Sequence, residues 1–240
     1  MLPLSDMNPT RRLPIMTYLF IAINVIVFLW EMSLNESQLT EAFLDLSVVP
    51  AKASDAPASL ETFLDIVRSM FFHGGYEHIA GNMLYLWLFG DNIEDRLGKI
   101  LYVIFYFIGG FMAAIAQVVI DPDSQIPLVG ASGAIAAVLG GYLVLFPGVK
   151  VRGIIPIGRI SQMAAWPAWA VLGMWFVVQL FSGITSLGVE TAGGGVAFFA
   201  HIGGFVAGMI MVGAFAVVVP QPEPEERREK LYQRSERHLF

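Results

Sequence analysis

Six segments of the chain are apolar runs long enough, or nearly long enough, to cross a lipid bilayer. A helix needs about 20 mostly apolar residues to span the hydrocarbon core. Only 14% of the residues are charged and 56% are hydrophobic, whereas a soluble domain has roughly 25% charged residues. We therefore expect an all-α, polytopic bundle of six transmembrane helices, over residues 14–31, 76–90, 100–120, 128–147, 163–182 and 196–219.

The distribution of Lys and Arg predicts the orientation of this bundle. Cytoplasmic flanks of membrane spans carry an excess of basic residues. Twelve of the fourteen Lys and Arg residues fall on one side of the predicted spans, and only Lys52 and Arg68 fall on the other. Both termini are thus expected in the cytoplasm, with residues 1–13 as the N-terminus, 14–219 as one membrane domain and 220–240 as a charged tail.

The longest predicted connection is the outer loop, residues 32–75. Five apolar residues in it recur at helical spacing, which predicts one short amphipathic helix at the membrane interface. These residues are Leu60, Phe63, Leu64, Val67 and Met70.

Composition also excludes several classes of function. The net charge of −6 is small and spread along the chain, so there is no basic footprint of nucleic-acid binding. The chain has no cysteine, which excludes disulfides, thiolate metal sites and a cysteine nucleophile. No metal or other cofactor is indicated.

Four polar residues on three predicted spans lie at a similar depth, near the outer side. His78 and Asn82 are four residues apart on the second span, so they share one helix face. Ser132 lies near the outer start of the fourth span, and His201 lies one to two turns into the sixth. Polar residues inside spans are rare and indicate function, so this coincidence of depth predicts a site.

Small residues on the fourth and sixth spans predict that these two helices approach closely. Ser132, Ala136 and Gly140 recur every four residues, and His201 lies on a similar stripe of the sixth span. Such stripes allow close helix packing in membranes, and a serine Oγ must lie about 2.6–3.2 Å from a histidine nitrogen to be activated. Ser132 as a mere packing residue is the alternative. The predicted packing residues are Gly130, Gly133, Ala136, Gly140, Gly204 and Gly208.

An acyl-transfer site also needs donors for an oxyanion. The Ser132 backbone N–H lies in the first turn of its helix and lacks an intrahelical partner, and His78 and Asn82 supply candidate side-chain donors. The predicted fourth, fifth and sixth spans contain no Asp or Glu. We therefore expect a Ser132–His201 dyad, with the imidazole oriented by packing or by a neutral hydrogen bond.

These motifs resemble those of the rhomboid intramembrane serine proteases. They are "HGGYEHIAGNMLYLWLFGDNIEDRLG" (73–98), the GxSG at 130–133 and "AHIGGFVAG" (200–208). The resemblance covers roughly residues 65–215. It implies Ser132 as nucleophile, His201 as general base, and His78, Asn82 and the Ser132 N–H as the oxyanion hole.

The resemblance further implies the substrates and the location of the protein. Substrates would be membrane-spanning segments of other proteins, cleaved near their outer end, with the fifth span and the outer loop as a lateral gate. We expect membrane-protein substrates and lipid as partners, and a bacterial or archaeal cell membrane with the site toward the outer face. His73 matches the family sequence too, as a loop-structuring residue.

The chain also departs from the family pattern. Some members carry an aromatic residue four positions after the serine, packed on the histidine, where this chain has Ala136. Phe198, Phe199 or Tyr142 are expected to support the base instead.

Two alternative functions compete with that of a serine protease. A zinc protease is disfavoured because "HGGYEH" lacks the H-x-x-E-H spacing and HExxH is absent. A non-catalytic rhomboid-like protein that binds and escorts transmembrane clients remains the alternative function.

Overall fold

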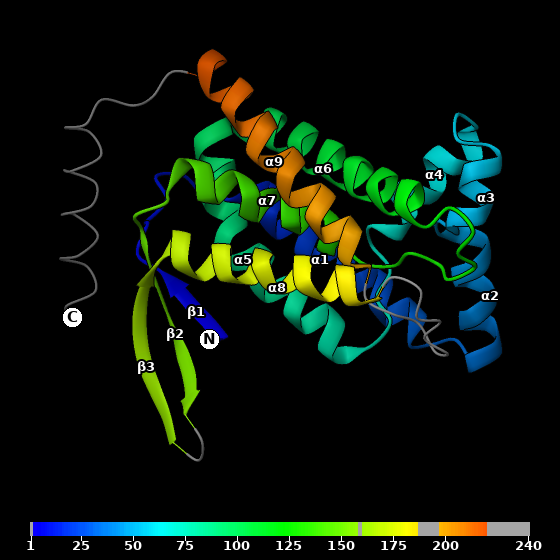
Figure 1. The fold of residues 1–240 in the computed structure, drawn as a ribbon, viewed down its shortest axis with the longest axis horizontal. Coiled ribbons are helices and arrows are strands. Elements are labelled where there is room, and N and C mark those ends of the chain that lie inside the picture. Colours follow the sequence, from blue (N-terminus) through cyan, green and yellow to red (C-terminus); the bar gives the residue numbers. More distant parts are fainter. Residues whose placement is uncertain (1, 158–159, 187–196, 220–240) are drawn as a thin grey trace.

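The computed structural model of the chain describes residues 2–157, 160–186 and 197–219. Within these ranges, long helices lie side by side in a bundle, short helices gather at one end of it, and a small sheet lies at the other (Figure 1). The long helices are α1 (Ile15–Glu31), α5 (Tyr76–Leu97), α6 (Lys99–Ile120), α7 (Ser132–Leu145), α8 (Ala168–Ser186) and α9 (Phe198–Val218). The predicted charged tail, 220–240, lies outside the described residues.

Three helices of the described residues are long and apolar enough to cross a membrane: α6, α8 and the first 18 residues of α9. Helices α1 and α7 are apolar but shorter, with 17 and 14 residues. Helix α5 begins at the predicted residue but continues to Leu97, and its last two turns carry Asp91, Glu94, Asp95 and Arg96. The mostly helical fold agrees with a membrane helical bundle, and the number of six spans stays a prediction.

Helix α7 occupies the centre of the bundle. Nine consecutive residues of it, 134–142, are buried, because α5, α6, α8 and α9 all pack around it. Small residues on α7 and α9 bring these two backbones together. A Cβ added at Gly204 would collide with the Gly133 carbonyl, and one added at Gly208 would collide with the Ala137 carbonyl.

The fold also contains a three-stranded antiparallel sheet, which corrects the expectation of an all-α protein. Its order is β1-β2-β3, formed by β1 (Leu2–Asp6), β2 (Lys150–Ile157) and β3 (Ile160–Pro167). Residues 163–167 were predicted as the start of the fifth span, which instead begins at Ala168 and runs to Ser186. Hydropathy alone does not separate a short apolar strand from a helix, and the β-branched residues of "KVRGIIPI" favour the strand.

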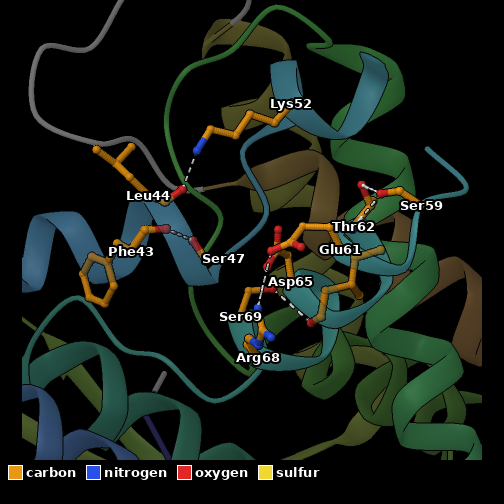
Figure 2. Close-up of polar contacts among 11 residues, drawn as sticks. Phe43, Leu44, Ser47, Lys52, Ser59, Glu61, Thr62, Asp65, Arg68 and Ser69 are labelled. Carbon is orange, nitrogen blue, oxygen red and sulfur yellow. Dashed lines mark hydrogen bonds and ion pairs between the residues drawn. The ribbon is translucent and has the colours of Figure 1, made fainter. Parts of the chain in front are cut away.

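The segment between α1 and α5 forms three short helices rather than the single one predicted. They are α2 (Glu36–Leu46), α3 (Pro50–Asp55) and α4 (Leu60–Ser69). Helix α4 is the predicted amphipathic helix; Ser59 caps it by accepting a hydrogen bond from the Thr62 N–H. Figure 2 shows the polar contacts that hold this segment, among them Lys52 Nζ donating to the Leu44 carbonyl at 2.8 Å and Arg68 paired with Asp65 at 3.1 Å.

Candidate active site

Ser132 is the first residue of α7, and the chain that precedes it is held by the segment between α1 and α5, which carries the short helices. The Leu128 N–H donates to the Val48 carbonyl at 2.7 Å, and the Gly130 N–H donates to the Ser69 carbonyl at 2.9 Å. Gly130 has a φ of +129°, a backbone conformation that favours glycine. These contacts fix the turn before α7. Because Ser132 begins the helix, its backbone N–H is among the first N–H groups, which have no intrahelical partner.

His201 lies in the first turn of α9 and meets Ser132 across the contact between α7 and α9. Its Nε2 atom lies 2.8 Å from the Ser132 Oγ, although 69 residues separate the two in the sequence. The close approach of the backbones makes this distance possible, because Gly204, one turn beyond His201, packs on the Gly133 carbonyl. Gly140 makes a second such contact, with the Phe205 backbone.

Helix α8 supplies two side chains that contact the His201 imidazole. Its Nδ1 lies 2.8 Å from the Gln179 Oε1, and the Trp175 ring lies 5.9 Å from it, centroid to centroid, at 36°. An amide oxygen only accepts hydrogen bonds, so Nδ1 carries the proton and Nε2 is free to accept from the Ser132 hydroxyl. This is the tautomer that a general base needs.

Neither Gln179 nor Trp175 was identified from the sequence. The expected supports differ, since Tyr142 lies at the sheet end of α7 and donates to Asp6 at 2.7 Å, and Phe198 packs beside Gly183. A signal for Gln179 was present, because it is the only amide in the apolar run of α8. Polar residues inside such runs indicate function.

His78 approaches Ser132 from α5, on the other side of the Gly130 turn. A Cβ added at Gly130 would lie 2.8 Å from His78 Cε1 and Nε2, and 3.5 Å from the Ser132 Oγ. The Gly74 N–H donates to His78 Nδ1, so His78 carries its proton on Nε2 and presents a donor toward the Gly130 turn. Gly130, expected as a helix-packing residue, therefore lies before the helix and leaves room for this ring.

Asn82 lies one helical turn beyond His78 on the same helix. The residue is 8% exposed, and its Nδ2 has no hydrogen-bond partner among the described residues. A buried amide donor without a partner is costly, and such an exception calls for a functional explanation. An oxyanion is one acceptor that would satisfy it.

His73 structures the loop that leads into α5. Its backbone N–H donates to the Glu31 Oε1 at 3.0 Å, its ring lies 5.1 Å from the His78 ring, and its Nδ1 lies 3.3 Å from the Phe71 carbonyl. Burial lowers the pKa of His73 to about 4, so its ring is neutral near pH 7 and adds no charge beside His78.

The fold and this pair of side chains define an integral membrane protein with a serine and a histidine in contact among its helices. Comparison with known proteins gives the family: the Rhomboid domain matches residues 60–217, and the chain belongs to the rhomboid family.

Three relatives illustrate how far the similarity extends. Rhomboid-related protein 2 of Mus musculus is 28% identical over 166 residues, which are 69% of this chain and 52% of that protein. Rhomboid protease GluP of Bacillus subtilis is 26% identical over 204 residues, 85% of this chain and 35% of that protein. Rhomboid protein 1, mitochondrial, of Saccharomyces cerevisiae is 26% identical over 201 residues, which are 81% of this chain and 51% of that protein. The chain thus spans about a third to a half of the length of these relatives.

Proposed function

We propose that the protein is an intramembrane serine endopeptidase that hydrolyses peptide bonds in or near transmembrane segments of other proteins. The observation that carries the proposal is the 2.8 Å contact between the Ser132 Oγ and the His201 Nε2, in a chain of the rhomboid family. That distance lies within the range needed for a histidine to activate a serine hydroxyl.

In the proposed first step, the Ser132 Oγ attacks the carbonyl carbon of the scissile bond while His201 Nε2 takes the hydroxyl proton. The carbonyl oxygen becomes an oxyanion. The tetrahedral intermediate then collapses, and His201 gives the proton to the leaving amine. The products of this step are the carboxy-terminal fragment of the substrate, released with a free amino group, and an acyl ester that joins the amino-terminal fragment to the Ser132 Oγ.

The oxyanion would be stabilised by donors on α5 and α7. We assign the Ser132 backbone N–H, the Nε2–H of His78 and the Nδ2–H of Asn82 to this role. Donors that are fixed before the reaction stabilise the developing charge without reorganisation, and the hydrogen bond from Gly74 to His78 fixes one of them.

Hydrolysis of the ester repeats the same chemistry with water. His201 takes a proton from a water molecule, the hydroxide attacks the ester carbonyl, and the proton returns to the Ser132 Oγ as the acid leaves. A transmembrane segment is helical because lipid offers its backbone no partners, so cleavage needs a locally unwound stretch. Small or helix-destabilising residues near one end of the substrate span provide it. We place substrate entry beside α8 and the segment 32–75.

We further propose that both termini are cytoplasmic and that the short helices α2–α4 face outward. Of the described basic residues, Lys52 and Arg68 lie on α3 and α4, and the others cluster toward the sheet end, for example Arg11 paired with Asp95 at 2.8 Å. Basic residues favour the cytoplasmic side. Ser132 would then lie near the outer face of a bacterial or archaeal cell membrane.

The proposal is tested with purified protein in detergent, a fluorophosphonate probe and a model substrate with one transmembrane segment. We expect covalent labelling at Ser132, and loss of both labelling and cleavage in Ser132→Ala. His201→Ala should lose cleavage. Ser186→Ala is the control, because among the described contacts the Ser186 hydroxyl donates to the Gly183 carbonyl of its own helix.

Two outcomes would contradict the proposal. Cleavage that persists in Ser132→Ala would exclude this serine as the nucleophile. Binding of the model substrate without any cleavage by the wild-type protein would favour the escort function instead.

A further inference from the structure

The base of the proposed dyad is held by a helix that contributes no reacting group. Helix α8 contacts His201 through Gln179, whose Oε1 lies 2.8 Å from Nδ1, and through Trp175, one turn earlier on the same face. The face continues with Phe176, whose ring stacks on that of Phe205 at 4.8 Å. The imidazole therefore lies between α7 on one side and this face of α8 on the other.

The two ends of α8 are held differently. At its start, the Ala168 N–H donates to the Val149 carbonyl at 2.7 Å and the Trp169 N–H donates to the Pro147 carbonyl at 3.0 Å. Among the described contacts, the second half of α8, which carries Gln179, makes no backbone hydrogen bond to another segment and is held by side-chain contacts. Over the 18 most apolar consecutive residues of α8 only 17% are buried, against 33% for the corresponding stretches of α6 and α9. Helix α8 is thus an edge helix, anchored at the sheet end.

The tautomer of His201 depends on the acceptor that α8 provides. With Gln179 in place, Nδ1–H donates to Oε1 and Nε2 accepts from Ser132. Without it, the neutral ring is free to carry its proton on Nε2, and that N–H would donate to the Ser132 Oγ. A histidine in this second state has no lone pair facing the serine and does not act as a base.

We infer that Gln179 and Trp175 are positioning residues of the dyad, which is aligned for catalysis only while α8 lies against α9. The inference deepens the proposed function and rests on it. It places the neutral partner of the base on a separate, weakly held helix, so that any displacement of the Gln179 end of α8 also withdraws the support of His201.

The test compares Gln179→Leu, which removes the acceptor, with Gln179→Glu, which keeps an acceptor oxygen at that position. A neutral hydrogen bond contributes modestly, so we expect Gln179→Leu to lower kcat about tenfold while KM changes less than about twofold. Gln179→Glu should recover most of that loss. Trp175→Phe should retain more activity than Trp175→Ala, because it keeps a ring over the imidazole.

Gln117→Leu is the matched control. Gln117 is also an amide in an apolar helix, and its Oε1 accepts from the Ala200 N–H at 3.3 Å, next to His201. Its loss should lower the thermal midpoint without changing kcat. A ¹⁵N spectrum of histidine-labelled protein adds a direct readout: His201 should show a protonated Nδ1 in the wild type and in Gln117→Leu, and a mixture of tautomers in Gln179→Leu.

The outcomes separate this inference from the proposed function. If Ser132→Ala is inactive but Gln179→Leu matches the wild type in kcat and in its ¹⁵N spectrum, the positioning role is wrong and the protease assignment stands. If Gln179→Leu changes only the thermal midpoint, as Gln117→Leu should, Gln179 is merely structural and the inference is again overturned. Cleavage by Ser132→Ala would overturn both.

Discussion

Gly208 of α9 packs directly against the backbone carbonyl of Ala137 on α7, so closely that a Cβ at Gly208 would collide with it. The same relationship joins Gly204 to the Gly133 carbonyl one turn away. These contacts fix the separation of the two helices that carry Ser132 and His201, and therefore the distance between the two reacting atoms.

Replacing Gly208 by alanine should push α9 away from α7. We expect Gly208→Ala to lower the thermal midpoint and to reduce cleavage more than tenfold, because even a small displacement of a catalytic group costs much of the rate. Gly213→Ala is the matched control, since a Cβ at that glycine of the same helix would meet no atom of another described element within 4 Å. It should be neutral or slightly stabilising, because alanine favours a helix over glycine. Equal effects of the two changes would contradict the packing argument.

The close packing of α7 and α9 could be predicted from the sequence, because small residues spaced three or four apart lie on one face of a helix. Predicting the stripe of small residues through Gly204 and Gly208, and the pair Ser132 and His201, did not require the arrangement of the helices around α7. Gln179 was missed for the opposite reason. Its contact with His201 depends on which face of α8 turns inward, and that face is decided by packing against α9 rather than by periodicity.

The sheet was missed for a different physical reason. Strand β1 pairs with β2 over more than half of the chain, with Leu2 opposite Ile154. Such a nonlocal pairing leaves no periodic trace in a short N-terminal segment. The apolar residues of β3 merged with those of α8, so hydropathy placed the start of the fifth span five residues too early, at 163 instead of 168.

The proposed oxyanion donors predict a large but incomplete loss of activity when either side chain is removed. His78→Ala and Asn82→Ala should each lower kcat by about 10²–10³ if they stabilise the transition state, while the fluorophosphonate-reactive serine and the fold remain. Glu77→Ala is the control, because Glu77 adjoins His78 but is exposed. The measurement is kcat and KM for the model substrate. An effect on KM alone would assign these side chains to substrate binding instead.

The proposed orientation is testable because the chain has no cysteine of its own. Single cysteines are introduced at Glu41 on α2 and at Lys99 at the start of α6, both of which are exposed. In spheroplasts of a bacterial host, a membrane-impermeant maleimide should label Glu41→Cys at once and Lys99→Cys only after permeabilisation. The reverse pattern would invert the topology, and labelling of both in intact spheroplasts would contradict the assignment of Lys99 to the cytoplasmic side.

The contacts of Asp6, at the end of β1, with α5 and α7 should make the free energy of unfolding depend on pH. Its Oδ2 accepts from the Tyr142 hydroxyl at 2.7 Å and from the Asn92 Nδ2 at 2.9 Å, yet burial outweighs these bonds and raises the pKa of Asp6 from 3.8 to about 6. The folded state therefore binds this proton more tightly than the unfolded state. The contribution of protonated Asp6 to the free energy of unfolding is fully present below about pH 4 and is lost as the pH rises through about 6.

Asp6→Asn removes this titration while keeping an oxygen that accepts from Tyr142. The shift corresponds to at most about 3 kcal/mol, so the variant should gain stability relative to the wild type between pH 5 and pH 7.5. Thermal midpoints measured in detergent at the two pH values give the comparison. Asp45→Asn, a change at an exposed position of α2, should leave the pH dependence of the wild type intact. A wild-type advantage over Asp6→Asn that grows with pH would show that the Asp6 carboxylate is stabilising in the folded protein, against the effect of its burial.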